Sequence, residues 1–311
     1  MRQGGGNLAL ARKPRMENRA IFRQRLLPYL LIFPQVLISV VFFYGPASEM
    51  FTEAFLLTNP FGGSSKFVWF QNFERLFDSP EYQSSLLRTA TFSICTMVLS
   101  VGLGLLFAVA ANRVRVGAMG IKTLLIVPYA IAPAIAGVLW LFLFHPAFGV
   151  LAFAMRNLGV AWNPLLNGNQ AMTLVIVASS WKEISYNFIF FLAGLQAIPL
   201  AMVEAAAVDG ADRLRRFWYI VLPLLSPTMF FLAVVNLVYA FFDTFGVIDA
   251  VTKGGPGQAT NTMIYKVYFD GFVGLNLGSS SAESAVLTAI VIGLTVVQFR
   301  YVERRVQYEL V

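Results

Sequence analysis

Two ionisable residues lie side by side within an apolar stretch of this chain. Lys182 and Glu183 fall inside the apolar segment 171–195. Ionisable groups in such segments are expensive to bury, so they are functional candidates by default. Adjacent residues point about 100° apart on a helix, so the two need not pair with each other. Lys182 is a candidate counter-ion for an anionic solute in a water-filled cavity. Two alternatives stay open, a structural ion pair between helices and a position near a membrane interface.

A polar stripe marks a second apolar segment, 218–244. Asn236, Tyr239 and Asp243 stand at i, i+3 and i+7, and therefore share one helix face. Such a stripe should face a cavity or a partner helix and not lipid. Both interpretations stay open, although Asp243 would repel an anion, which favours a structural role for it. The candidate path consists of five residues: Lys182, Tyr186, Asn187, Asn236 and Tyr239.

Metal-binding and catalytic side chains are scarce. The chain has one cysteine, Cys95, and one histidine, His145, so disulfide frameworks and cysteine zinc sites are excluded. His145 has no second ligand at metal spacing, and we expect a solvated loop residue. A membrane-embedded enzyme would need clustered His, Asp or Glu on neighbouring segments. We therefore predict no catalytic residue, no metal and no cofactor.

The composition is that of a membrane protein. Hydrophobic residues make up 58% and charged residues 13%, against roughly a quarter charged in an ordinary soluble domain. A bilayer can solvate this surplus of apolar surface, and a soluble core cannot. The net charge is +7, but the basic residues stand between apolar segments. This placement indicates membrane orientation and contact with lipid, not nucleic-acid binding.

We predict an all-α polytopic protein with six membrane spans, since a spanning helix needs about 20 mostly apolar residues. Pro128 and Pro133 predict kinks in the third span. The predicted spans are 27–47, 86–111, 121–144, 171–195, 218–244 and 284–303.

Lys and Arg are concentrated in alternate connections. By the positive-inside rule, this pattern places both termini in the cytoplasm. A cleavable signal peptide is the alternative for the N-terminus, but the apolar run reaches spanning length and no small-residue cleavage site closes it. We expect a basic cytoplasmic arm (1–26), a transmembrane domain (27–303) and a cytoplasmic tail (304–311). The basic residues that set this orientation are Arg2, Arg12, Lys13, Arg15, Arg19, Arg23, Arg25, Arg113, Arg115, Lys122, Arg213, Arg215, Arg216, Arg300, Arg304 and Arg305.

The connection at about 200–223 has helix and turn signals. Glu204 and the following alanines favour a helix, Gly210 can take a left-handed turn, and Pro223 limits a second helix. We predict a short cytoplasmic helix, a tight turn and a helix leading back into the membrane.

This connection resembles a known family signature. The pattern is Glu-Ala-Ala, three residues, Gly, nine residues, Ile, one residue, Leu-Pro, as in the cytoplasmic loop of permease subunits of bacterial ATP-binding-cassette (ABC) importers. The matching residues are Glu204, Ala205, Ala206, Gly210, Ile220, Leu222 and Pro223. The resemblance implies the type I importer permease fold, an inner-membrane location and a loop that docks on a separate ATPase. The chain has no Gly-x-x-x-x-Gly-Lys-Ser/Thr motif, so we expect ATP hydrolysis by another subunit.

Other segments extend the resemblance over nearly the whole chain. The runs 128–133, 181–187 and 239–245 are similar to the sn-glycerol-3-phosphate permease family within the carbohydrate-importer group. The resemblance implies a second permease, an ATP-binding homodimer and a periplasmic binding protein as partners. It implies sn-glycerol 3-phosphate or a glycerophosphodiester as substrate; a neutral sugar or other polyol is the alternative. An ion-coupled secondary transporter is disfavoured because no internal repeat is evident.

Overall fold

The structure is a computed structural model that describes residues 26–58, 65–114 and 116–303. Helices make up most of the described chain, and the two short strands pair as an antiparallel hairpin with Leu56 opposite Phe67. The elements are α1 (Leu27–Ser39), η1 (Val40–Tyr44), α2 (Gly45–Glu53), β1 (Leu56–Thr58), β2 (Ser65–Phe67), α3 (Gln71–Asp78), α4 (Pro80–Arg113), α5 (Ala118–Ile126), η2 (Val127–Ala130), α6 (Pro133–Leu143), α7 (Val150–Asn157), α8 (Gly168–Ala197), α9 (Leu200–Val208), α10 (Arg213–Arg216), η3 (Phe217–Val221), α11 (Leu222–Leu224), α12 (Ser226–Val238), η4 (Tyr239–Asp243), α13 (Phe245–Val251), α14 (Met263–Tyr268), η5 (Phe269–Val273), α15 (Leu277–Val297) and η6 (Gln298–Val302).

The chain divides into two units, Met1–Glu49 and Met50–Val311. In the first, α1 and η1 form a continuous apolar helix that leads into the start of α2. Its large apolar side chains, such as Phe33 and Phe42, are exposed on all sides. A helix that is apolar all round is suited to a lipid environment.

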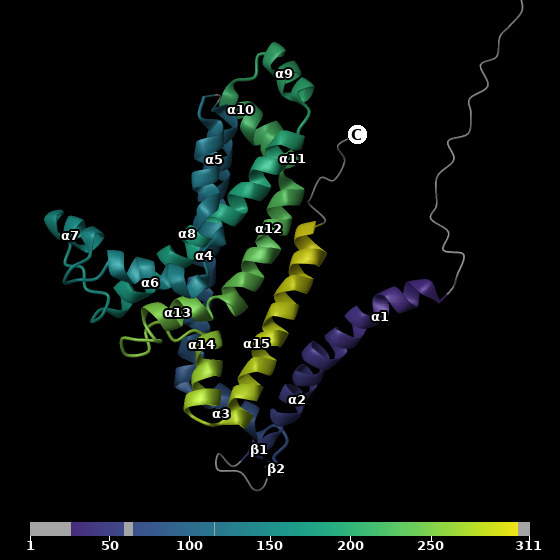
Figure 1. Cartoon of the computed structure of the whole chain (residues 1–311), viewed down its shortest axis with the longest axis vertical. Coiled ribbons are helices and arrows are strands. Elements are labelled where there is room, and N and C mark those ends of the chain that lie inside the picture. The colour runs from purple at the N-terminus through teal and green to yellow at the C-terminus, as the bar shows by residue number, and fades with distance from the viewer. Residues whose placement is uncertain (1–25, 59–64, 115, 304–311) are drawn as a thin grey trace, which may run out of the picture. The chain divides into compact units, whose positions relative to one another are not determined.

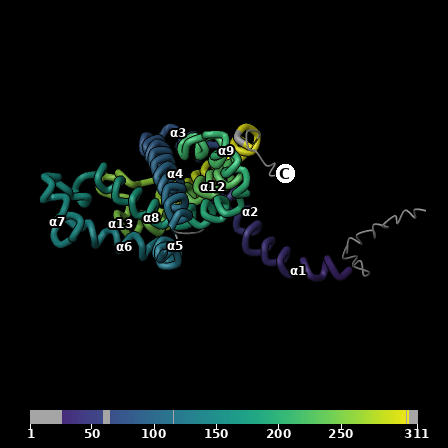
Figure 2. The backbone as a smooth tube through the Cα atoms, turned by 90° about the horizontal axis from the view of Figure 1, so that it is seen from above, coloured from purple at the N-terminus to yellow at the C-terminus, as the bar shows by residue number. Residues whose placement is uncertain are grey.

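The second unit is built around long helices that run side by side. α4 packs along α8 over much of its length, and α12 packs against both. The α9 and α10 helices lie at one end of this unit, and α3 lies at the other (Figure 1). Viewed along this long direction, α4, α8 and α12 lie close together (Figure 2).

Side-chain caps set the starts of three long helices. The Ser79 hydroxyl accepts a hydrogen bond from the Tyr82 N–H at the start of α4. The Asn167 side chain caps α8 in the same way, and Asn276 caps α15. Caps supply acceptors for N–H groups that have no partner within the helix, which fixes where each helix begins.

Within the described residues, four helices are long and apolar enough to cross a membrane: Leu27–Glu53, Pro80–Arg113, Ser226–Asp243 and Leu277–Tyr301. Two bent pairs bring the number to six if each pair is one span. These segments correspond to the six predicted spans. The fifth span begins later than predicted, because η3 and α11 precede it.

The third predicted span is not one straight helix. The segments Ala118–Ala130 and Pro133–Leu143 meet at 106°. Ile131 and Ala132 between them are extended, with ψ of 131° and 143°. Pro133 has no N–H to continue a helix and disfavours helical geometry at the residue before it. The prolines thus produce a sharp break where the sequence predicted only kinks.

Close backbone approach explains the tight packing of α4 on α8. A Cβ atom placed at Gly104 would lie 2.6 Å from the Asn187 Cβ and 3.2 Å from the Phe188 backbone nitrogen. Neither atom is the end of a flexible side chain. Small residues allow membrane helices to pack closely, and here a hydrogen atom is all that fits.

We expect Gly104→Ala to destabilise the folded chain by about 1–3 kcal/mol, because overpacking would force α4 and α8 apart. Gly102→Ala is the matched control, since a Cβ at Gly102 meets nothing within 4 Å. Thermal unfolding of the purified chain in detergent measures the effect. Equal melting temperatures for the two variants would contradict this account of the helix contact.

Candidate functional site

The connection at 200–223 has the predicted arrangement of a short helix, a tight turn and a second helix. α8 ends at Ala197, and α9 leaves it at an angle of 66°. Gly210 follows α9 with φ of +84°, the left-handed conformation expected for this glycine. α10 and η3 then lead into α11 and α12. We call residues 200–223 the coupling loop.

Hydrogen bonds within the coupling loop cap α10 and link it to α9. The Asp212 carboxylate accepts from the Arg215 backbone N–H at 2.7 Å, which caps α10. The Arg216 guanidinium donates to the Asp212 carbonyl oxygen at 3.4 Å and to the Val203 carbonyl oxygen at 3.5 Å. The last bond, although long, links α10 directly to α9.

The seven signature positions divide into two groups by exposure. Glu204, Ala205 and Gly210 are exposed and form the outer part of the loop. The other four signature residues, Ala206, Ile220, Leu222 and Pro223, are half-buried and pack within the protein. The outer part can therefore meet another molecule, and the inner part anchors the loop to the helices behind it.

Large apolar side chains add to this outer surface. Val208 is 87% exposed, Tyr219 77% and Leu214 67%. Trp218 is also exposed. These four residues are not part of the signature. Their apolar side chains within an arginine-rich connection are the sequence feature that could have identified them. Several large exposed apolar side chains on one polar loop are typical of an interaction surface.

Lys182 lies in an aromatic setting on α8. It is half-buried, and its Nζ lies 5.2 Å from the centroid of the Tyr129 ring, a cation–π distance. The Tyr129 ring is 5.6 Å from that of Tyr186, a candidate residue one turn along α8. Tyr129 stands in a segment quoted for the family resemblance but was not among the candidate path residues. Lys182, Tyr129 and Tyr186 form one cluster.

Asn187 and Asn236 form a hydrogen-bonded pair between α8 and α12. The Asn236 Nδ2 donates to the Asn187 Oδ1 at 2.7 Å, and the Asn187 Nδ2 donates back at 3.2 Å. The Ser100 hydroxyl of α4 donates to the Asn236 Oδ1 at 2.9 Å. All three residues are buried. This arrangement gives both asparagines partners within the chain and joins three helices.

The remaining polar residues near this pair differ in exposure. Tyr239 is buried in η4, Glu183 is buried on α8, and Asp243 is exposed. The structure therefore separates the predicted stripe into two buried residues, Asn236 and Tyr239, and one exposed carboxylate. Of the five candidate path residues, Lys182 and Tyr186 remain partly accessible.

Two further sequence features have structural explanations. The His145 ring stacks on Phe148 with centroids 3.9 Å apart, and its Nδ1 accepts from the Ala147 N–H. Across the described ranges, no group of three His, Cys, Asp or Glu side chains could hold a metal ion. The segment 253–257 forms a turn, in which Lys253, Gly254 and Gly257 all have positive φ.

The comparisons with known proteins identify the family. Residues 100–308 match the family of binding-protein-dependent transport system inner membrane components. The chain belongs to this family. It is 57% identical over 290 residues to the sn-glycerol-3-phosphate transport system permease protein UgpA of Rhizobium meliloti (strain 1021), covering 93% of this chain and 99% of that relative.

Solved structures show the same fold. A bacterial ABC transporter involved in the import of the acidic polysaccharide alginate matches with a TM-score of 0.79 and 22% identity, over 89% of this chain and 95% of that one. The alginate transporter in complex with an alginate pentasaccharide-bound periplasmic protein matches with a TM-score of 0.76 and 22% identity, over 88% and 92%. The predicted importer permease fold is confirmed, and the chain is a transport component.

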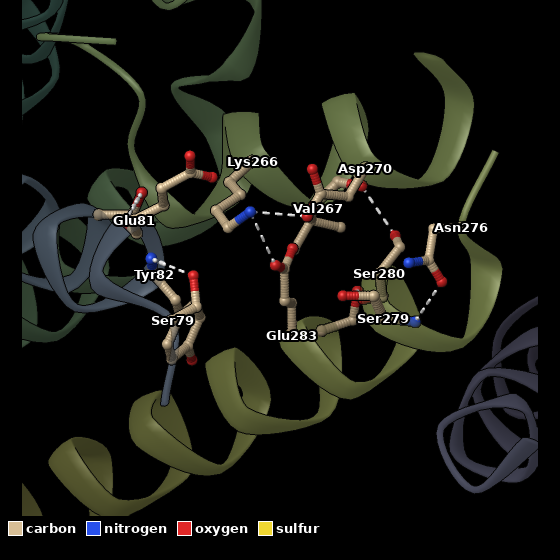
Figure 3. A network of polar contacts seen from close by, with 12 residues as sticks. Ser79, Glu81, Tyr82, Lys266, Val267, Asp270, Asn276, Ser279, Ser280 and Glu283 are labelled. Carbon is tan, nitrogen blue, oxygen red and sulfur yellow. Dashed lines mark hydrogen bonds and ion pairs between the residues drawn. The ribbon is translucent and has the colours of Figure 1, made fainter. Parts of the chain in front are cut away.

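The permease also contains a buried charge network that the sequence analysis missed (Figure 3). The Lys266 Nζ lies 2.6 Å from the Asp270 Oδ2 and 3.3 Å from the Glu283 Oε1. The Glu283 side chain, on α15, is 1% exposed. Burial alone would lower the pKa of Lys266, but the hydrogen bond to Asp270 and the charges of Glu283 and Asp270 outweigh it and raise the pKa. Lys266 therefore stays charged and ties α14 to α15.

We expect Lys266→Met to destabilise the permease by about 3–5 kcal/mol, because it leaves two neighbouring carboxylates without their cation. Lys253→Met, at an exposed lysine in the preceding turn, is the control and should have little effect. Adding Glu283→Gln to Lys266→Met should restore part of the loss. The melting temperature of the purified protein measures all three, and an unchanged value for Lys266→Met would contradict the role of the network.

Proposed function

We propose that this chain is a membrane-spanning permease subunit of an ATP-driven importer for sn-glycerol 3-phosphate or a glycerophosphodiester. The observation that best supports this substrate is the 57% identity, over nearly the full length of both chains, to a protein named for sn-glycerol-3-phosphate transport. The Lys182 cluster supports it, because a partly accessible cation can attract a phosphate.

The proposed assembly has four kinds of component. Beside this chain there are a second permease, an ATP-binding homodimer that hydrolyses ATP, and a periplasmic binding protein. The complex lies in the inner membrane with both termini of this chain in the cytoplasm. The alternating distribution of Lys and Arg supports this orientation. The related fold of an alginate transporter in complex with a periplasmic protein supports the binding-protein partner.

In this proposal the coupling loop is the mechanical link to the ATPase. Its outer part, with Glu204, Ala205 and the exposed side chains of Val208 and Leu214, docks on the ATP-binding subunit. Closure of the ATPase then moves the loop, and the two permeases change between inward-open and outward-open states. Each state is favoured through differential contacts with ATP-bound subunits and with the loaded binding protein.

Uptake by the complete complex in membrane vesicles tests the substrate. We expect labelled sn-glycerol 3-phosphate to be transported and to be displaced by a glycerophosphodiester, with no displacement by a neutral sugar. Lys182→Ala should reduce this uptake roughly tenfold to a hundredfold, because a charge-assisted hydrogen bond contributes about 1.5–3 kcal/mol. Lys182→Arg should keep part of the activity, since the charge remains and the geometry changes.

Lys122→Ala is the matched control, since Lys122 is another half-buried lysine, located on α5. The yield of assembled complex is measured beside uptake. Low yield and uniform loss for every solute with Lys182→Ala would show that Lys182 is a structural partner between helices. Displacement by a neutral sugar would overturn the phosphate substrate.

Gly210 provides the test of coupling. Gly210→Val should abolish ATPase stimulation by the loaded binding protein while the chain still inserts into the membrane. The left-handed conformation costs a residue with a Cβ roughly 1–2 kcal/mol, and more when it is β-branched. Gly210→Asn is the control, because asparagine tolerates this conformation. Normal stimulated ATPase activity and transport in Gly210→Val would show that the turn does not matter.

A further inference from the structure

A cavity of about 720 Å³ lies behind the coupling loop, where the ends of α4 and α8 meet α9, α10 and η3. Its size falls within the roughly 300–1,000 Å³ typical of small-molecule sites. The transport mechanism proposed above assigns no ligand to this cavity. None of its lining residues belongs to the Lys182 cluster, and six of the eleven lie in the coupling loop.

The lining has two chemically different parts. Arg113, Arg213, Arg216 and Asn112 supply polar groups, and every other lining residue is apolar, including Val109, Leu195 and Phe217. Within the described ranges of the chain, no Asp or Glu side chain lines the cavity. Such a lining matches an amphiphile with an anionic head and an apolar tail.

The arginines have few competing partners. In the part of the chain that the structure describes, none of the three guanidinium groups lies within 4.0 Å of a carboxylate oxygen. Among the described residues, Arg216 donates only to the carbonyl oxygens of Asp212 and Val203. Arg113 and Arg213 are exposed and lie on different helices, α4 and α10. Their donors are thus available to a ligand that bridges the two helices.

We propose that this cavity binds an anionic phospholipid. Its phosphate accepts hydrogen bonds from Arg113 and Arg213, since the planar guanidinium fork matches phosphate oxygens. The first part of an acyl chain lies against Val109, Leu195 and Phe217. The charge pattern predicts that this end of α4 is at the cytoplasmic surface, where basic pockets between helices bind anionic headgroups.

The apolar part of the lining distinguishes a lipid from a free anion. Inorganic phosphate would satisfy the arginines but would leave the apolar side chains against water, which is unfavourable. A lipid removes this apolar surface from water while its phosphate stays at the rim. The position at the bend between α8 and α9 also keeps such a ligand at the depth of the membrane surface.

Native mass spectrometry of the intact complex tests the proposal, with phosphatidylglycerol and phosphatidylcholine added separately. We expect tight retention of phosphatidylglycerol and little retention of phosphatidylcholine. Arg113→Gln combined with Arg213→Gln should reduce phosphatidylglycerol retention about a hundredfold or more, since it removes two charge-assisted hydrogen bonds to the phosphate. Arg215→Gln is the matched control on the same helix, because Arg215 lines a different cavity.

Val109→Trp tests the apolar part separately. Filling this part should displace phosphatidylglycerol while all three arginines remain. Arg113→Gln alone is measured as well, so that a double variant that does not assemble leaves the test intact. Equal retention of both lipids, unchanged retention in Arg113→Gln, or unchanged retention in Val109→Trp would each overturn the proposal. Displacement of phosphatidylglycerol by millimolar inorganic phosphate would show a soluble-anion site and would also overturn it.

Discussion

A helix in lipid must satisfy its own backbone hydrogen bonds, and this constraint decides where the permease can bend. α4 has no proline after Pro80, at its start, and runs unbroken for 34 residues. The chain breaks at Ile131–Ala132, where Pro133 removes a donor, and at Ile198–Pro199, where α8 turns into α9. The freed backbone groups at these breaks need protein or water around them. The bends therefore mark positions that cannot face hydrocarbon.

Buried polar side chains also need hydrogen-bond or ion-pair partners. Asn187 and Asn236 are buried and form hydrogen bonds to each other between α8 and α12. Ser100 of α4 donates a further hydrogen bond to Asn236. Lys266 is held between two carboxylates on α15 and η5. Lys182 differs from all of these, because its contact is an aromatic ring and part of its surface remains accessible. Among the described residues no carboxylate lies within 4.0 Å of the Lys182 Nζ, which agrees with the contact to an anionic substrate proposed above.

The sequence predicted the six apolar segments and the turn at Gly210, since both depend on local features, apolar length and backbone freedom. It could not predict the 106° break in the third segment, because a proline kink and a full break have the same local signature. The Lys266 network joins residues 17 positions apart on separate helices, and no spacing rule connects them. The mutual pairing of Asn187 and Asn236 likewise depends on how α8 meets α12. Tertiary packing decided these features.

A loop that transmits motion must be accessible on one side and fixed on the other. The signature positions show both properties, with Glu204 exposed and Pro223 half-buried beside the start of α12. The Arg216 guanidinium donates to the Val203 carbonyl oxygen, which links α10 to α9. η3 and α11 continue from α10 without an intervening loop and end at Leu224, and the next residue, Leu225, is a buried turn residue. The Asn236 pair lies on the helix that follows. In the coupling role proposed here, a push on the loop would reach the contact between α8 and α12 through η3, α11 and, after the turn at Leu225, α12.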